Sequence, residues 1–315
     1  MPFVTAFYRA LGTGMVISVD SPIDDKVRSA MESLIEDYEH VLSRFRNDSL
    51  IAAIGKAEHG GSFDFPDWCA PLFDLYDALF SATSGAIDPC VGEDLIRLGY
   101  DASLSFTVTQ DAPEHLGALR GRAVWGRDVT RHGTTLVTHE PVQLDFGACG
   151  KGYLVDLLGR MLQSSQFVID AGGDLLIHAE QPISVALEDP EDQSHAIGIA
   201  HIANGALCAS APSRRHWNVA VNERTQIAIH HLLNAIDGLP AQQTEASWAY
   251  VPANATLNLV RDYPTAVADG LATALFVSDV AQLQRTFDFT YATLDESRQI
   301  AVSRNFPAEL FLRSA

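Results

Sequence analysis

The chain has 315 residues, of which 47% are hydrophobic, and its formal net charge at pH 7 is −19. This size and composition predict an ordinary globular protein with a large core, built as one domain or as two closely packed lobes. The acidic excess argues against a nucleic-acid ligand. It also means that an anionic ligand would need a metal ion or locally placed Lys and Arg side chains.

Alternating apolar residues predict strands, and apolar residues at helical spacing predict helices. In the N-terminal half, strands are expected at residues 4–8, 15–19, 123–125 and 135–138. Helices are expected after Pro22 and after Pro66, and Gly85 is the expected C-terminal cap of the second. The polar stretch 104–121 has no clear period, so we expect it to form an excursion on the surface.

Short strands dominate the predicted C-terminal half. They are expected at residues 167–170, 174–178 (after a Gly-Gly turn), 183–187, 197–202, 206–209, 227–233, 291–294 and 300–303. Helices are expected after Pro264 and over residues 280–287. Because no repeat or low-complexity linker interrupts this order, we predict a single α+β domain over residues 1–315, with mixed or antiparallel sheets and helices packed on their faces.

Cysteine spacing and the N-terminus bear on the compartment. The four cysteines are widely scattered and include no Cys-x-x-Cys pair, which indicates neither a zinc site nor a dense disulfide framework. The first residues lack the basic start and apolar core of a signal peptide, and no apolar run approaches the length of a membrane span. We therefore expect a cytoplasmic protein.

The most distinctive stretch is 143–156, where alternating apolar residues lead into three glycines within six residues and then into helical spacing. This pattern predicts a strand, a tight turn and a helix start, whose free N–H groups suit a phosphate. Asp145 and Lys151 bracket the predicted turn. It is not a Walker A loop, because Asp145 stands where that loop needs Gly and Gly152 where it needs Ser or Thr. The alternative is a glycine turn that lets a helix pack on its strand.

Two further features suggest chemistry. Asp269 and Thr273 are four residues apart on a predicted helix, so their oxygens lie on one face and suit Mg²⁺. Such a pair is more often only a solvated face. His230 and His231 end a predicted strand, where neighbouring side chains point to opposite faces, so only one of them can enter a cleft. A His at a strand end is also often an ordinary packed residue.

Taken together, five ordered motifs resemble the ApbE family of FAD:protein FMN transferases over nearly the whole chain. They are residues 11–13 (LGT, for the family's MGT), 42–49 (LSRFRNDS), 84–92 (SGAIDPCVG), 144–156 (LDFGACGKGYLVD) and 268–276 (ADGLATALF). Two segments depart from the family pattern. The family's TSG is ASA at residues 209–211, and its HxxDPxTG is HLLNAIDG at residues 231–238.

The resemblance implies an ApbE-like (T-fold-like) structure with FAD in a cleft between two lobes and Mg²⁺ on its pyrophosphate. It implies that the metal is held by Asp269, Thr273 and the carbonyl of Ala148, and that His231 acts as a base. The residues that it implies contact the dinucleotide are Leu11, Phe45, Ser84, Gly85, Asp145, Lys151 and Ala272.

The reaction implied by the resemblance is Mg²⁺-dependent transfer of the FMN moiety of FAD to a Thr or Ser hydroxyl of a partner flavoprotein, with release of AMP. One alternative is an FAD pyrophosphatase, in which water replaces the hydroxyl and the products are FMN and AMP. Another is a non-catalytic FAD-binding protein. An intact His231 favours the enzymes, whereas the altered segments 209–211 and 234–237 favour the binding protein.

Overall fold

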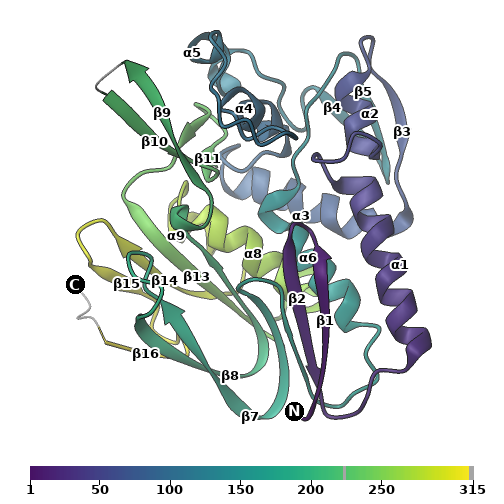
Figure 1. Cartoon of the computed structure of the whole chain (residues 1–315), viewed down its shortest axis with the longest axis vertical. Helices are drawn as coiled ribbons and strands as arrows, with labels where there is room; N and C mark the ends of the chain where they lie inside the picture. The colour runs from purple at the N-terminus through teal and green to yellow at the C-terminus, as the bar shows by residue number, and fades with distance from the viewer. Residues whose placement is uncertain (223–224, 312–315) are drawn as a thin grey trace.

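The computed structural model describes residues 1–222 and 225–311. A nine-stranded sheet runs through the molecule in the order β1-β2-β6-β7-β8-β13-β14-β15, with β16 paired to β8 (Figure 1). Every pairing in it is antiparallel. Its strands are β1 (Phe3–Ala10), β2 (Thr13–Val19), β6 (Phe167–Asp170), β7 (Asp174–Glu188), β8 (Ala196–Ser210), β13 (Thr244–Pro252), β14 (Thr290–Asp295), β15 (Ile300–Val302) and β16 (Ala308–Leu310).

Helices cover one face of this sheet and enclose the main core. The layer next to the strands is formed by α6 (Gly147–Gly159), which packs on β7, and α8 (Pro264–Ala274), which packs on β8 and β13. The helices α1 (Asp25–Leu42) and α3 (Ala70–Ala82) pack on α6. Shorter helices are α2 (Leu50–Lys56), α7 (Asn258–Asp262) and α9 (Val280–Leu283). Among the residues that the structure describes, no helix combines the length and apolarity needed to cross a bilayer.

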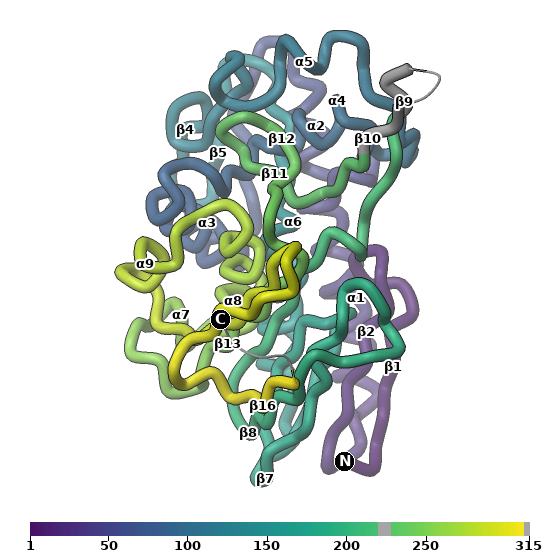
Figure 2. Tube along the Cα trace, turned by 90° about the vertical axis from the view of Figure 1, so that its left-hand side faces the viewer, coloured from purple at the N-terminus to yellow at the C-terminus, as the bar shows by residue number. Residues whose placement is uncertain are grey.

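A second group of elements lies at the upper end of Figure 1, beyond the N-terminal end of α6. It holds α4 (Gly92–Arg97), α5 (Ala112–His115), the hairpin β9–β10 (His216–Asn222 and Thr225–His230), the pair β11–β12 (Leu233–Asn234 and Leu239–Pro240) and the sheet β3-β5-β4 (Gly61–Asp64, Thr135–Thr138 and Val129–His132). Leu95, Leu116, Trp217 and Ile229 form a separate core there. The hairpin β9–β10 stands out from the body in both views (Figures 1 and 2).

Local sequence rules explain the helices that shape the site. The side chain of Asp24 accepts a hydrogen bond from the Lys26 N–H and so caps α1. Buried Met31, Ile35 and Tyr38 lie on one face of that helix, as their spacing predicts. Pro264 occupies the first turn of α8, where its missing N–H costs nothing.

The mixed α+β class with an antiparallel sheet is confirmed, and several element boundaries are corrected. Each long strand, β7 and β8, replaces two short predicted strands. The alternation is interrupted because the β7–β8 pairing shifts register between His178 and Ile183. The strand expected at residues 123–125 is wrong, since only Trp125 makes an isolated bridge there. The stretch 104–121 is more than a surface excursion, because Leu116 is buried.

The cap of α3 also differs in detail from the expectation. The N–H of Gly85 does bond to the Phe80 carbonyl at 2.8 Å, and the N–H of Ser84 bonds to the Ser81 carbonyl at 3.2 Å. These two bonds form a Schellman motif, in which the residue that takes the left-handed conformation at the first position after the cap is Ser84, with φ 53°.

The prediction of a strand and a glycine turn before α6 is wrong. Residues 140–146 form no strand, and α6 begins at Gly147, so the three glycines lie inside the helix. The reason is close helix packing: a Cβ added at Gly152 would lie 2.3 Å from the Thr265 carbonyl oxygen of α8. The alternative interpretation, a glycine turn that lets the helix pack on the strand before it, is also wrong, because Gly152 lets α6 approach another helix, α8.

Candidate functional site

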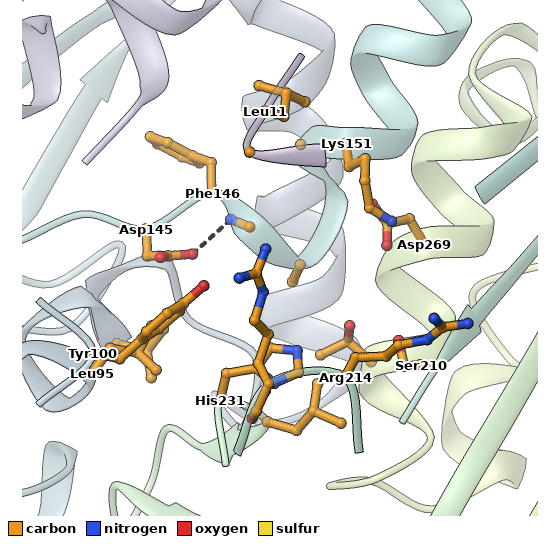
Figure 3. A pocket seen from close by; sticks show the side chains of 18 of the residues that line it. Leu11, Leu95, Tyr100, Asp145, Phe146, Lys151, Ser210, Arg214, His231 and Asp269 are labelled. Carbon is orange, nitrogen blue, oxygen red and sulfur yellow. Dashed lines mark hydrogen bonds between the residues drawn. The ribbon is translucent and has the colours of Figure 1, made fainter. Parts of the chain in front are cut away.

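A cavity of about 800 Å³ opens at the N-terminal end of α6. It is lined by both groups of elements: the β1–β2 turn, the end of α1, the first turns of α6, the chain from residue 209 to 215, His231 and one face of α8. Figure 3 shows Leu11, Asp145, Lys151, His231 and Asp269 around one space. The turn at Leu11 is held in place because its N–H donates to the Glu39 side chain at 2.8 Å.

The helix pair α6–α8 supplies one wall. Asp269 is buried, and its Oδ2 accepts a hydrogen bond from the Gly152 N–H at 2.9 Å. Lys151 forms an ion pair with Asp174, a fully buried residue of β7. Burial, followed by the nearby charge of Asp174, raises the pKa of Asp269 well above its ordinary value. Ala148 and Thr273 line the cavity beside these groups.

This wall fits a hard divalent cation. Lys151 pairs with the carboxylate of Asp174, a second carboxylate, that of Asp269, lines the same cavity, and Oδ1 of Asp174 is buried without a hydrogen-bond partner among the described residues. Within that same part of the chain, no three His, Cys, Asp or Glu side chains come together as a metal site, so carbonyl and hydroxyl oxygens would have to complete the coordination. Ala148 and Thr273 can supply them, and oxygen donors with few carboxylates suit Mg²⁺. Sequence reasoning missed Asp174, although the Gly-Gly-Asp turn marked its position.

The opposite wall is built around Asp145. Its Oδ1 accepts from the Gly147 N–H at 2.6 Å, the contact dashed in Figure 3, and its Oδ2 pairs with Nε of Arg44. The guanidinium carbon of Arg44 lies 4.1 Å from the ring centre of Phe45 and 4.7 Å from that of Tyr100. Arg44 therefore fixes a carboxylate and two aromatic rings at once. Its role was not visible in the sequence, because its partners are distant along the chain.

His231 lines the cavity, and His230 does not. Nδ1 of His231 lies 3.2 Å from the Arg215 carbonyl oxygen, which can only accept, so Nδ1 carries the proton and Nε2 keeps a lone pair. Burial lowers the pKa of His231 to about 4, so the ring is neutral at pH 7. Nε2 of His230 instead donates to the Ala241 carbonyl at 2.9 Å. Only one of the two enters the cavity, but strand alternation is not the reason: the strand predicted over residues 227–233 ends at His230, and the chain bends at His231.

Three of the expected ligand-contacting residues lie outside the cavity lining. Ser84 is exposed, and its Oγ accepts from the Gln282 side chain at 3.1 Å. Gly85 belongs to the same cap of α3. Ala272 is fully buried in α8, and its carbonyl accepts from Ser247 Oγ at 2.6 Å. The other expected residues all line the cavity, namely Leu11, Phe45, Asp145, Ala148, Lys151, His231, Asp269 and Thr273.

The two segments that depart from the family pattern keep an ordinary backbone. Ala211 replaces a glycine, but its φ is −151°, which any residue adopts. Asn234 Oδ1 accepts from the Ile236 N–H at 3.0 Å, and the Asn234 carbonyl accepts from the Gly238 N–H at 2.7 Å. Asn234 therefore forms the Asx turn that brings the chain back after His231.

Comparisons with known proteins bear on the family and the fold. The family model described as "ApbE family" matches residues 11–292. Among curated relatives, FAD:protein FMN transferase of Klebsiella pneumoniae is 23% identical over 83% of this chain and 74% of its own, and that of Treponema pallidum is 27% identical over 80% and 72%.

Solved structures show the same fold. The ApbE protein of Thermotoga maritima superposes with a TM-score of 0.79 at 20% identity, covering 98% of this chain and 99% of the other. Flavin transferase ApbE from Vibrio cholerae gives a TM-score of 0.76 at 18% identity, covering 96% and 97%. At this level of identity the superpositions establish the fold alone.

Proposed function

Because the chain belongs to the ApbE family, we propose that it is an enzyme that transfers the FMN moiety of FAD to a Thr or Ser hydroxyl of a partner flavoprotein and releases AMP. The observation that carries the proposal is the position of His231, a neutral base with a free Nε2, in the same cavity as Lys151 and the oxygen atoms of Asp269 and Thr273. A base and an anion-binding wall are what phosphoryl transfer requires.

The residues divide the work by their chemistry. Nε2 of His231 accepts the proton of the acceptor hydroxyl, whose oxygen forms a bond to the FMN phosphorus, while the bond from that phosphorus to the AMP oxygen breaks. Mg²⁺, when bound, would neutralise pyrophosphate charge. Asp269, Thr273 and the Ala148 carbonyl are the groups that would hold it, and Lys151 would add a second positive charge. Arg44 keeps Asp145 paired, so that this carboxylate does not repel the anionic substrate.

The intact turn after His231 favours an enzyme over a protein that only stores FAD. The side chain of Asn234 forms an ordinary Asx turn without the Asp-Pro pair, and the backbone conformation of Ala211 does not require glycine. Water could take the place of the acceptor hydroxyl in the same geometry. FAD pyrophosphatase activity is therefore the alternative that an experiment must separate from transfer.

Incubation of the purified protein with FAD, Mg²⁺ and candidate acceptor flavoproteins, each followed by intact mass, tests the proposal. An acceptor that gains the mass of the FMN moiety, with one AMP released per adduct, supports transfer. AMP and free FMN in equal amounts without an adduct indicate the pyrophosphatase. Tight FAD binding without AMP release indicates the non-catalytic FAD-binding protein. A titration should also show stronger binding of FAD than of riboflavin, and equal affinity would contradict pyrophosphate recognition.

A further inference from the structure

The cationic side chains that line the cavity differ in one respect. Four of them form ion pairs with carboxylates: Arg44 with Asp145, Arg46 with Glu36 and Asp48, Lys151 with Asp174, and Arg214 with Glu188. Arg215 lines the same cavity but forms no ion pair within residues 1–222 and 225–311. In a chain with a net charge of −19, a cation without a carboxylate partner at a cavity suggests that an anionic ligand is its partner.

The backbone fixes Arg215 relative to the proposed base. Its carbonyl accepts from the His231 N–H at 3.3 Å and from Nδ1 of the same ring at 3.2 Å. Arg215, His231 and Tyr100 all line the same cavity. Burial lowers the pKa of His231 and raises that of Tyr100, and the positive charge of Arg215 acts to lower both.

We propose that Arg215 is a further catalytic residue, whose guanidinium binds the phosphoryl oxygens at the phosphorus that the acceptor attacks. The inference rests on the proposed function. Negative charge on those oxygens is spread and repositioned in the transition state, and the planar fork of an Arg side chain matches two of them. Lys151 cannot fill this role alone, because its ammonium group is already paired with a fully buried carboxylate, that of Asp174.

The step balances without any additional reactant. The proton of the acceptor hydroxyl moves to Nε2 of His231, the acceptor oxygen bonds to phosphorus, and AMP departs with the bridging oxygen and the electron pair of the broken bond. Arg215 neither forms nor breaks a covalent bond. It lowers the barrier by holding a positive charge where water would otherwise have to reorganise.

Arg215→Gln and Arg215→Lys, with Arg214→Gln as the matched control, test the proposal. Arg214 is the neighbouring residue in the same cavity, but it is already paired with Glu188 at 2.9 Å. At saturating FAD, Arg215→Gln should lower the rate of AMP release about 10²–10³-fold, the usual cost of removing one transition-state donor. Arg215→Lys should recover part of that loss, since it keeps the charge but not the fork. Arg214→Gln should cost much less.

Binding supplies a readout that does not depend on turnover. Without Mg²⁺, Arg215→Gln should weaken the binding of FAD and of inorganic pyrophosphate but not that of riboflavin, which has no phosphate. Equal losses of AMP release in the Arg214 and Arg215 variants would overturn the inference. If the wild-type protein releases no AMP, the proposed function fails. The pyrophosphate affinities of the wild type and of Arg215→Gln then test the contact between Arg215 and phosphate independently of that function. Unchanged pyrophosphate affinity in Arg215→Gln would refute the contact. Because Arg214 and Arg215 are both exposed, all three variants should unfold at the wild-type temperature.

Discussion

Gly152→Ala should separate the two helices that carry the candidate metal-binding groups. The added Cβ would lie 2.3 Å from the Thr265 carbonyl oxygen, a backbone atom that cannot rotate away. Since non-bonded carbon atoms make unstrained contacts only from about 3.5 Å, α6 and α8 would have to move apart by roughly 1 Å. The same movement would stretch the 2.9 Å hydrogen bond from the Gly152 N–H to Asp269.

Three contributions determine the size of this effect. Forcing a methyl group into a packed contact costs about 1–3 kcal/mol. Weakening a hydrogen bond to a buried carboxylate costs about 1.5–3 kcal/mol. Replacing Gly by Ala inside a helix returns about 0.5–1 kcal/mol. The free energy of unfolding should therefore fall by about 2–5 kcal/mol, and the Mg²⁺ concentration needed for turnover should rise, because Asp269 shifts relative to Ala148.

Thermal unfolding of Gly152→Ala beside Gly150→Ala provides the assay. A Cβ at Gly150, in the same helix, would meet its nearest neighbour, Tyr38 Oη, at 3.4 Å, an ordinary contact. Gly150→Ala should therefore keep the wild-type stability or gain slightly. If the two variants unfolded at the same temperature, the claim that Gly152 sets the α6–α8 separation would be refuted.

Asp269→Ala should abolish Mg²⁺-dependent AMP release and leave the fold intact. Thr273→Ala should have a milder effect, because water can replace a neutral ligand. If AMP release by Asp269→Ala depended on the Mg²⁺ concentration as in the wild type, the metal assignment would be excluded. His231→Ala should lose about 10²–10⁴-fold in turnover and largely keep FAD binding, and His230→Ala should lose far less; the reverse order would disprove the assignment. With a folded-state pKa of about 4 for His231, the unfolded chain binds more protons between pH 4 and 6.5, so this ring should reduce stability as the pH falls through that window. An NMR titration of the His231 ring with a midpoint near 6.5 would contradict this.

The parts of the site that depend on local spacing could be predicted from the sequence. Asp269 and Thr273 are one helical turn apart in α8, and both line the cavity. His231 lines the cavity and His230 does not, as predicted, but β10 ends at His230 and the chain bends at His231, so strand alternation does not explain the difference. Only the relation between Asp269 and Thr273 follows from a local period, that of the helix.

The parts that depend on long-range contacts could not be predicted. Arg44 and Asp145 are 101 residues apart, and Lys151 and Asp174 are 23 apart, so no local pattern marks either pair. The role of the glycines in α6 also depends on a long-range contact. Three glycines before a helical pattern are typical of a turn, and only the position of α8 shows that Gly152 serves helix packing.

The two departures from the family pattern change side chains but leave an ordinary backbone conformation. Any effect on activity should therefore come from the side-chain groups that are lost. Asn234 has nearly the shape of the family's Asp and forms an Asx turn through its side-chain oxygen, but it lacks the negative charge. Ala209 lines the cavity where the family carries a Thr hydroxyl. One change removes a carboxylate three residues after His231, and the other removes a hydroxyl group from the cavity lining. Neither change alters a cationic side chain of the cavity lining, so we expect the activity of this chain to depend more strongly on Arg215 than on any group in the altered segments.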